Sequence, residues 1–126
     1  MLPLIVASVF NQMLERERVL TAIEYVESGG RGAETPDGDG GKAIGPFQIH
    51  RVYWLDATER RPDLREQGYA ACHDPIYARE VVRCYLERYH AKTPEQMARI
   101  HNGGPKGCSK KATIPYWDKV REALRK

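Results

Sequence analysis

The sequence has few cysteines, and their number and spacing exclude a dense disulfide framework. Only three occur among the 126 residues. An odd number cannot pair completely, and no pair has the close CxxC spacing of a zinc site. One disulfide with one thiol and three thiols are both compatible with the sequence. The three residues are Cys72, Cys84 and Cys108.

The sequence also lacks a long apolar run, a strong charge of one sign and a pattern of metal ligands. No stretch is long enough to span a membrane. The formal net charge of +3 is too small to indicate nucleic-acid binding, because Lys and Arg are interspersed with Asp and Glu. This mild basic bias suits an anionic partner, or only solubility. The histidines share no ligand spacing. We therefore expect no metal, no cofactor, no nucleic-acid or membrane partner, and a monomer.

A short apolar run, Leu2 to Phe10, opens the chain. No Lys or Arg precedes it, and no clear small-residue cleavage site closes it, so it does not form a clear signal peptide. We interpret it as a packing helix at the start of an N-terminal helical extension that covers residues 1–17. A degraded or truncated signal sequence is the alternative.

The remaining pattern predicts a mostly helical chain. A first helix is expected from Leu2 to Ser28, with a possible break near Glu15 to Arg18, and Gly29 and Gly30 end it. The glycine-rich segment 30–45 allows only a tight hairpin or loop. Further helices are expected near Tyr53 to Ala57, after the N-cap Asp74, after the capping-box pair Thr93 and Gln96, and after Pro115. The prediction is one α+β domain over residues 1–126, predominantly helical with a small β-hairpin.

Glu27 occupies an unusual place in the first helix. At about 100° per residue, it falls between Ile23 and Leu20 in the apolar arc, whereas Glu24 and Glu17 lie at the edge or outside as solvated charges. Burial favours the neutral form of a carboxyl group. A carboxylic acid that stays protonated near neutral pH is what a general acid needs. The alternative is a partly exposed or ion-paired Glu.

Asp39 and Asp37 lie in the glycine-rich loop that returns from the helix of Glu27. Aspartates are common in turns, so either residue alone is adequately explained as a turn former. The loop leads directly into Gly45-Pro46-Phe47-Gln48, however, and a hairpin there could bring a carboxylate across a cleft from Glu27. Two carboxyl groups in one cleft are what hydrolysis of a glycosidic bond requires.

A second candidate segment is His101-Asn102-Gly103-Gly104-Pro105, at the end of a predicted helix. Its residues are explained as a helix stop, but such a loop could also present His101 and backbone amides to a sugar. Four aromatic residues could stack on sugar faces, and we expect some of them to be core. They are Tyr53, Trp54, Tyr116 and Trp117.

Several segments in the same order resemble the invertebrate-type lysozyme (destabilase) family over roughly residues 20–122. The first are Glu27-Ser28-Gly29, Gly45 to Ile49 and Tyr53 to Ala57. The later ones are Tyr85 to Tyr89, Ala98 to Cys108 and Thr113 to Trp117. Six motifs in register are far more specific than any one of them.

The resemblance implies a lysozyme-like fold and a muramidase, which cleaves the β-1,4 bond between N-acetylmuramic acid and N-acetylglucosamine in peptidoglycan. It implies Glu27 as general acid and Asp39 as second carboxylate, with Asp37 as the alternative. The expected sugar contacts are Gln48, Tyr53, His101, Asn102 and Gly103. The resemblance also implies secretion or action at a bacterial cell wall.

Two other functions are compatible with this sequence. One is a non-catalytic module that binds cell walls. The other is an isopeptidase, an activity credited to some family members through a Ser and a Lys that flank the Gly45 to Ile49 segment. Here those regions read Gly40-Gly41-Lys42 and His50, and this chain also has fewer cysteines than most family members.

Overall fold

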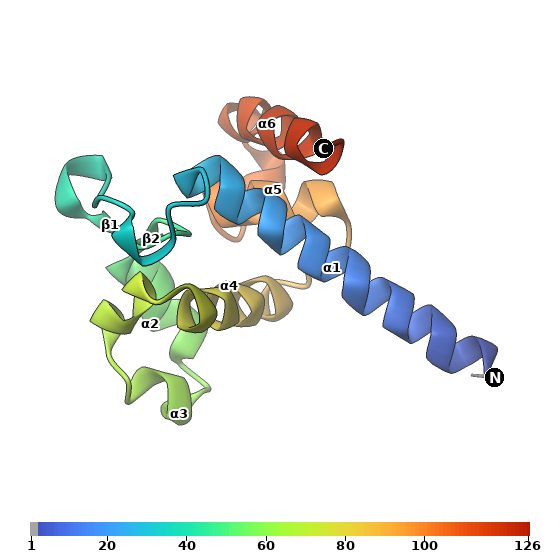
Figure 1. The fold of residues 1–126 in the computed structure, drawn as a ribbon, viewed down its shortest axis with the longest axis horizontal. Helices are drawn as coiled ribbons and strands as arrows, with labels where there is room; N and C mark the ends of the chain where they lie inside the picture. Colours follow the sequence, from blue (N-terminus) through green and yellow to red (C-terminus); the bar gives the residue numbers. More distant parts are fainter. Residues whose placement is uncertain (1–2) are drawn as a thin grey trace.

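The computed structural model describes residues 3–126, which form mostly helices, with one small sheet at one edge of the molecule (Figure 1). The predicted α+β, predominantly helical architecture with a small hairpin is confirmed. The α-helices are α1 (Leu4–Ser28), α2 (Arg51–Thr58), α3 (Pro62–Arg65), α4 (Pro75–Arg88), α5 (Pro94–Gly103) and α6 (Ile114–Leu124). The antiparallel sheet pairs β1 (Ala43–Ile44) with β2 (Ile49–His50). Short 3₁₀ turns join them, among them η1 (Gly32–Glu34), η2 (Asp39–Gly41) and η3 (Tyr69–His73).

Local sequence signals set the starts of two long helices as predicted. The side chain of Asp74 accepts a 2.9 Å hydrogen bond from the backbone N–H of Tyr77 and caps α4. Thr93 and Gln96 form a reciprocal capping box at the start of α5. Each cap supplies an acceptor for backbone donors that have no partner inside the helix, which is why the helices begin at these residues.

The core forms around the C-terminal half of α1, which packs against α4, α5 and α6 (Figure 1). The large side chains buried there come from α1, the hairpin segment and the later helices. They include Leu20, Ile23, Phe47, Ile49, Val81, Val82, Leu86, Met97 and Val120. The packing of α1 against these helices fixes the position of its last turn, which carries Glu27.

The N-terminal half of α1 differs from the prediction. The helix is unbroken from Leu4 to Ser28, and its first three turns project away from the other helices (Figure 1). Leu4 is 89% exposed, and Phe10 and Leu14 are about half exposed. The segment is helical as predicted, but the prediction that it packs against the protein is wrong, because these turns contact no other part of the described chain. Leu2, where we predicted the helix to begin, lies outside the described residues.

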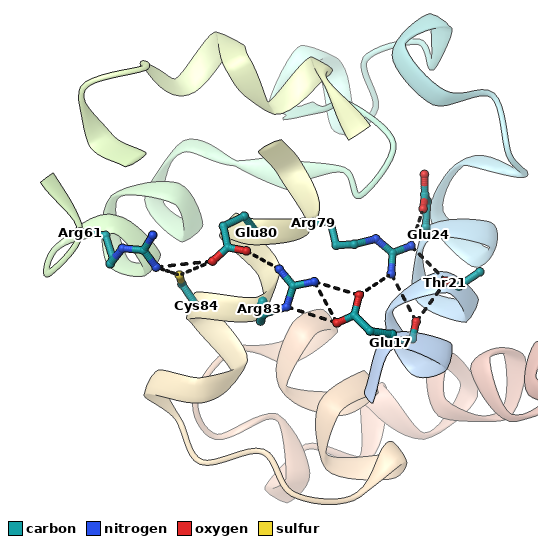
Figure 2. A network of polar contacts seen from close by, with 8 residues as sticks. All are labelled: Glu17, Thr21, Glu24, Arg61, Arg79, Glu80, Arg83 and Cys84. Carbon is teal, nitrogen blue, oxygen red and sulfur yellow. Dashed lines mark hydrogen bonds and ion pairs between the residues drawn. The ribbon is translucent and has the colours of Figure 1, made fainter. Parts of the chain in front are cut away.

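The acidic residues of α1 also differ from the prediction. Glu17 and Glu24 were expected to be solvated, but both form ion pairs with Arg79 of α4 (Figure 2). Arg83 binds Glu17 as well, with N–O distances of 2.8 and 2.9 Å. Because Arg79 and Arg83 of α4 form ion pairs with these carboxylates, Glu17 and Glu24 lie in the interface between α1 and α4. The same network continues along α4 through Glu80 (Figure 2).

Gly45 allows the hairpin to approach the chain at η3. Its φ of +75° is unfavourable for residues with a side chain, and a Cβ built there would lie 1.9 Å from the carbonyl oxygen of Cys72. The turn between β1 and β2 therefore packs directly on the backbone of η3. This contact sets the hairpin against the helical body.

All three cysteines are free thiols. Cys72 is buried, and burial raises its pKa to about 12, so its thiol is unreactive at neutral pH. Cys84 lies within hydrogen-bond distance of Arg61 (Figure 2), and Cys108 is exposed. Within residues 3–126, no helix has the length and apolar character needed to cross a membrane.

Candidate active site

A cleft of about 240 Å³ lies between the hairpin segment and helices α1, α2 and α5. It brings together six of the seven predicted site residues: Glu27, Asp39, Gln48, Tyr53, His101 and Asn102. Ala43 and His50 complete the lining. Larger hollows occur along α1, but none of them contains a predicted site residue.

Glu27 reaches the cleft from the last turn of α1. Its side chain is only 19% exposed. Its Oε2 atom accepts a 2.8 Å hydrogen bond from the hydroxyl of Tyr116 on α6, and Nε2 of His101 on α5 lies 3.1 Å from the same oxygen. Three helices thus converge on one carboxyl group.

His101 is enclosed between polar partners on both sides of its ring. Its side chain is 3% exposed, and its Nδ1 atom lies 2.9 Å from the hydroxyl oxygen of Tyr53. The ring of Tyr53 is in turn stacked on that of Tyr85, with centroids 3.7 Å apart. Burial, together with the nearby Tyr85 and Glu27, raises the pKa of Tyr53 well above its usual value, so its phenol stays protonated.

Asp39 lies in a different environment from Glu27. It is exposed in η2 with a φ of +49°, a conformation that Asp tolerates better than most residues. Nε2 of His50 lies 2.7 Å from its Oδ2 atom. The hydrogen bond from His50 holds the pKa of Asp39 below its usual range, with smaller contributions from the charges of His50 and Lys42. One carboxyl group of the cleft is enclosed by hydrogen-bond partners, and the other is kept ionised.

The remaining predicted residues divide between the cleft and its surroundings. The amide of Gln48 donates to the carbonyl of Gly45 at 3.0 Å, which fixes the turn beneath the cleft. Asn102 is exposed at the cleft. Gly103 and Asp37 are not among the lining residues. A Cβ at Gly103 would lie 2.5 Å from Cγ2 of Thr113, so this glycine is needed for packing between α5 and η5 (Lys111–Thr113).

Sequence reasoning missed two residues that bind the carboxyl groups. Tyr116 was considered as a sugar-stacking aromatic, and His50 as the residue that replaces the lysine of an isopeptidase site. The Thr113 to Trp117 motif was a signal for Tyr116, but no pattern showed that this residue meets Glu27, 89 positions earlier. Trp54 is core, as expected of some of the aromatics: it is buried and donates to the hydroxyl of Tyr77.

The site holds no cluster suited to a metal. Across residues 3–126, no group of three or more His, Cys, Asp or Glu side chains could hold an ion. Glu27, with its buried partners, can exchange a proton, and Asp39 can present a negative charge. These are the roles of the acid and the nucleophile in a glycosidase.

A helical body with a small hairpin and two carboxyl groups in one cleft defines a protein of the lysozyme-like class. The fold is similar to the crystal structure of Tapes japonica lysozyme, with a TM-score of 0.70 and 30% identity over 83% of this chain and 87% of that one. Residues 17–123 match the family described as Destabilase. The chain belongs to the destabilase family, which confirms the resemblance found in the sequence.

Two curated relatives are similar to this chain over more than half of its length. It is 36% identical to the lysozyme of Meretrix lusoria over 112 residues, which cover 84% of this chain and 88% of that protein. It is 38% identical to the lysozyme of Ostrea edulis over 84 residues, 63% of this chain. That match spans 58% of the length of the Ostrea edulis protein.

Proposed function

We propose that this chain is a peptidoglycan hydrolase, a muramidase that cleaves the β-1,4 bond between N-acetylmuramic acid and N-acetylglucosamine. The observation that carries the proposal is the presence of Glu27 and Asp39 in one cleft, with contrasting environments. Family membership and the relatives named lysozyme support the same reaction.

The proposed mechanism retains the configuration of the anomeric carbon. Glu27, in its protonated form, donates a proton to the glycosidic oxygen. The ionised Asp39 attacks or stabilises the anomeric carbon, and Glu27 then activates a water molecule. Retention requires carboxyl groups about 5–5.5 Å apart, and lysozymes are the type case of this scheme. The low pKa of Asp39 suits a residue that must be ionised throughout.

A turbidity and reducing-sugar assay on purified peptidoglycan tests the reaction. We expect Glu27→Gln to abolish lysis while it leaves the fold intact, because an amide cannot act as an acid. Glu34→Gln is the matched control, since Glu34 is an exposed acid in η1 that does not line the cleft. Full lysis by Glu27→Gln contradicts the proposal.

The same assay separates the two other functions. A cell-wall binding module would sediment with peptidoglycan without releasing reducing sugar. An isopeptidase would cleave a γ-Glu-ε-Lys bond even after Glu27 is replaced. No residue of the cleft lining is a serine or a lysine, so nothing in this cleft favours the second activity.

The second carboxylate is tested by paired substitutions. We expect Asp39→Asn to lose nearly all activity and Asp37→Asn to keep it, because Asp39 lines the cleft and Asp37 does not. The reverse pattern would assign the role to Asp37. Proton NMR of the first products tests the stereochemistry: a β-anomer supports the double displacement, and an α-anomer contradicts it.

Binding, assembly and location complete the proposal. Of the five predicted sugar contacts, Gln48 and Asn102, which line the cleft, are proposed to bind the sugar. Gly103 does not line the cleft, and the polar atoms of Tyr53 and His101 are bound to each other and to Glu27. The chain is proposed to be one domain and a monomer that is secreted or acts at a bacterial cell wall. A single unfolding transition and a monomer mass by light scattering are the expected results, and detection of the protein outside its source cells tests the location.

A further inference from the structure

The two hydrogen-bond partners of Glu27 bind the same oxygen atom. Tyr116 and His101 both contact Oε2, at 2.8 and 3.1 Å. Among residues 3–126, no group hydrogen-bonds Oε1. The two oxygens of this carboxyl group therefore differ, although they are equivalent in a free Glu side chain.

The directions of these hydrogen bonds follow from the chemistry of each group. Burial, with the nearby Glu27, raises the pKa of Tyr116 well above its usual value, so Tyr116 is a phenol that donates to Oε2. When Glu27 is ionised, its oxygens only accept hydrogen bonds, so Nε2 of His101 also donates to Oε2. With both donors retained, Oε2 stays an acceptor when Glu27 is protonated, and the proton lies on Oε1. In a neutral imidazole, Nδ1 is then the acceptor, and the hydroxyl of Tyr53 donates to it.

We propose that Tyr116, His101 and Tyr53 are positioning residues that make Oε2 of Glu27 a permanent acceptor and leave the transferable proton on Oε1. Tyr53 acts through His101, because its hydroxyl selects the tautomer that donates to Glu27. The consequence for catalysis rests on the proposed function, whereas the hydrogen-bond directions do not.

This assignment differs from a sugar-binding role for the same residues. Both ring nitrogens of His101 have protein partners, and its side chain is 3% exposed. The hydroxyl of Tyr53 is engaged with His101, and its ring is stacked on Tyr85. A residue that binds sugar changes KM when it is replaced, whereas a residue that places a proton changes mainly kcat.

Nitrogen-15 NMR of the His101 ring tests the hydrogen-bond directions without any substrate. In the wild type, we expect the neutral form of His101 to carry its proton on Nε2. In Tyr53→Phe, the acceptor at Nδ1 loses its donor, and we expect a mixture of tautomers. A wild-type His101 with the proton on Nδ1, or a tautomer that is the same in Tyr53→Phe, overturns the proposal.

The pH dependence of hydrolysis tests the consequence for Glu27. The groups that face Glu27 are Tyr53, His101 and Tyr116, with Asp39 and His50 also lining the cleft. In Tyr116→Phe, we expect kcat to fall about 10- to 100-fold with KM nearly unchanged. A lost donor favours the protonated acid, so the basic limb of the pH profile should move to higher pH.

Tyr89→Phe is the matched control. Its hydroxyl also hydrogen-bonds a carboxylate, that of Asp56, but neither residue lines the cleft. This variant should keep the wild-type kcat and pH profile. An unshifted profile in Tyr116→Phe, or a raised KM with an unchanged kcat, overturns the proposal. Retained lysis by Glu27→Gln would instead overturn the proposed function, and the NMR result would still stand by itself.

Discussion

The imidazole of His50 lies 2.7 Å from the carboxylate of Asp39 and holds the pKa of that group below its usual range. The pair joins β2 to η2 at the edge of the cleft. It therefore ties the charge of the proposed nucleophile to a residue of the hairpin, eleven positions along the chain.

Replacement of His50 should change the acid side of the pH profile. In His50→Phe, the carboxylate loses its hydrogen bond and its positive neighbour, so the pKa of Asp39 rises. Asp39 is then protonated at a higher pH, and the acidic limb of kcat/KM should move upward. Activity assays between about pH 3 and 7 measure this shift. His90→Asn is the control, because His90 is exposed and does not line the cleft. The prediction is contradicted if the acidic limb moves upward in His90→Asn, or if it does not move in His50→Phe.

The ion pairs between α1 and α4 should stabilise the fold. Arg79 contacts Glu17 and Glu24, and its side chain is 22% exposed. Arg79→Met keeps the length of the side chain but leaves both carboxylates without this partner. We expect the free energy of unfolding to fall by about 1–3 kcal/mol, measured by urea denaturation.

A matched surface pair separates this effect from loss of charge alone. Arg121 pairs with Asp118 at 3.1 Å, and both side chains are more than half exposed. Because exposed pairs contribute little, Arg121→Met should change stability by less than about 1 kcal/mol. Equal effects of the two substitutions would show that the position between α1 and α4 is unimportant.

The exposed first turns of α1 should be dispensable for folding. Deletion of residues 1–14 removes a segment whose described side chains, those of residues 3–14, are largely exposed, and the buried part of the helix begins at Val19. We expect the midpoint of thermal unfolding and the activity to remain unchanged. A deletion that extends through Leu20 removes two fully buried residues and should cost several kcal/mol, roughly 2–5 for a large core side chain. Destabilisation by the shorter deletion would contradict the observed exposure.

Gly45 should tolerate no side chain. In Gly45→Ala, the new methyl group would collide with the backbone of Cys72 in addition to the strain of a positive φ. We expect a loss of at least about 2 kcal/mol in the free energy of unfolding. Gly40→Ala is the control, because φ is +65° there but no atom lies within 4 Å. It should cost only the backbone strain, about 1 kcal/mol. Similar losses at both positions would contradict the close approach.

Local patterns in the sequence predicted the helices well, because their causes are local. The N-cap of Asp74 and the capping box of Thr93 and Gln96 satisfy backbone groups a few residues away. The helical wheel placed Glu27 beside Ile23 and Leu20, and both of these neighbours are buried. Such features depend only on residues within one or two turns.

Contacts between distant residues could not be predicted in this way. The wheel showed that Glu27 faces inward, but not that Tyr116 and His101 meet its carboxyl group 89 and 74 positions later. The same difficulty explains the error for Glu17 and Glu24, whose partners lie on α4.

The sequence by itself determined the helical class, the family and the residue types of the cleft. Only the tertiary structure decided which carboxyl group is enclosed and which is exposed, and that the apolar start of α1 packs on nothing in the described chain. The physical reason is that burial and the partners of a side chain depend on how separate helices pack, whereas periodicity shows only which face of one helix is apolar.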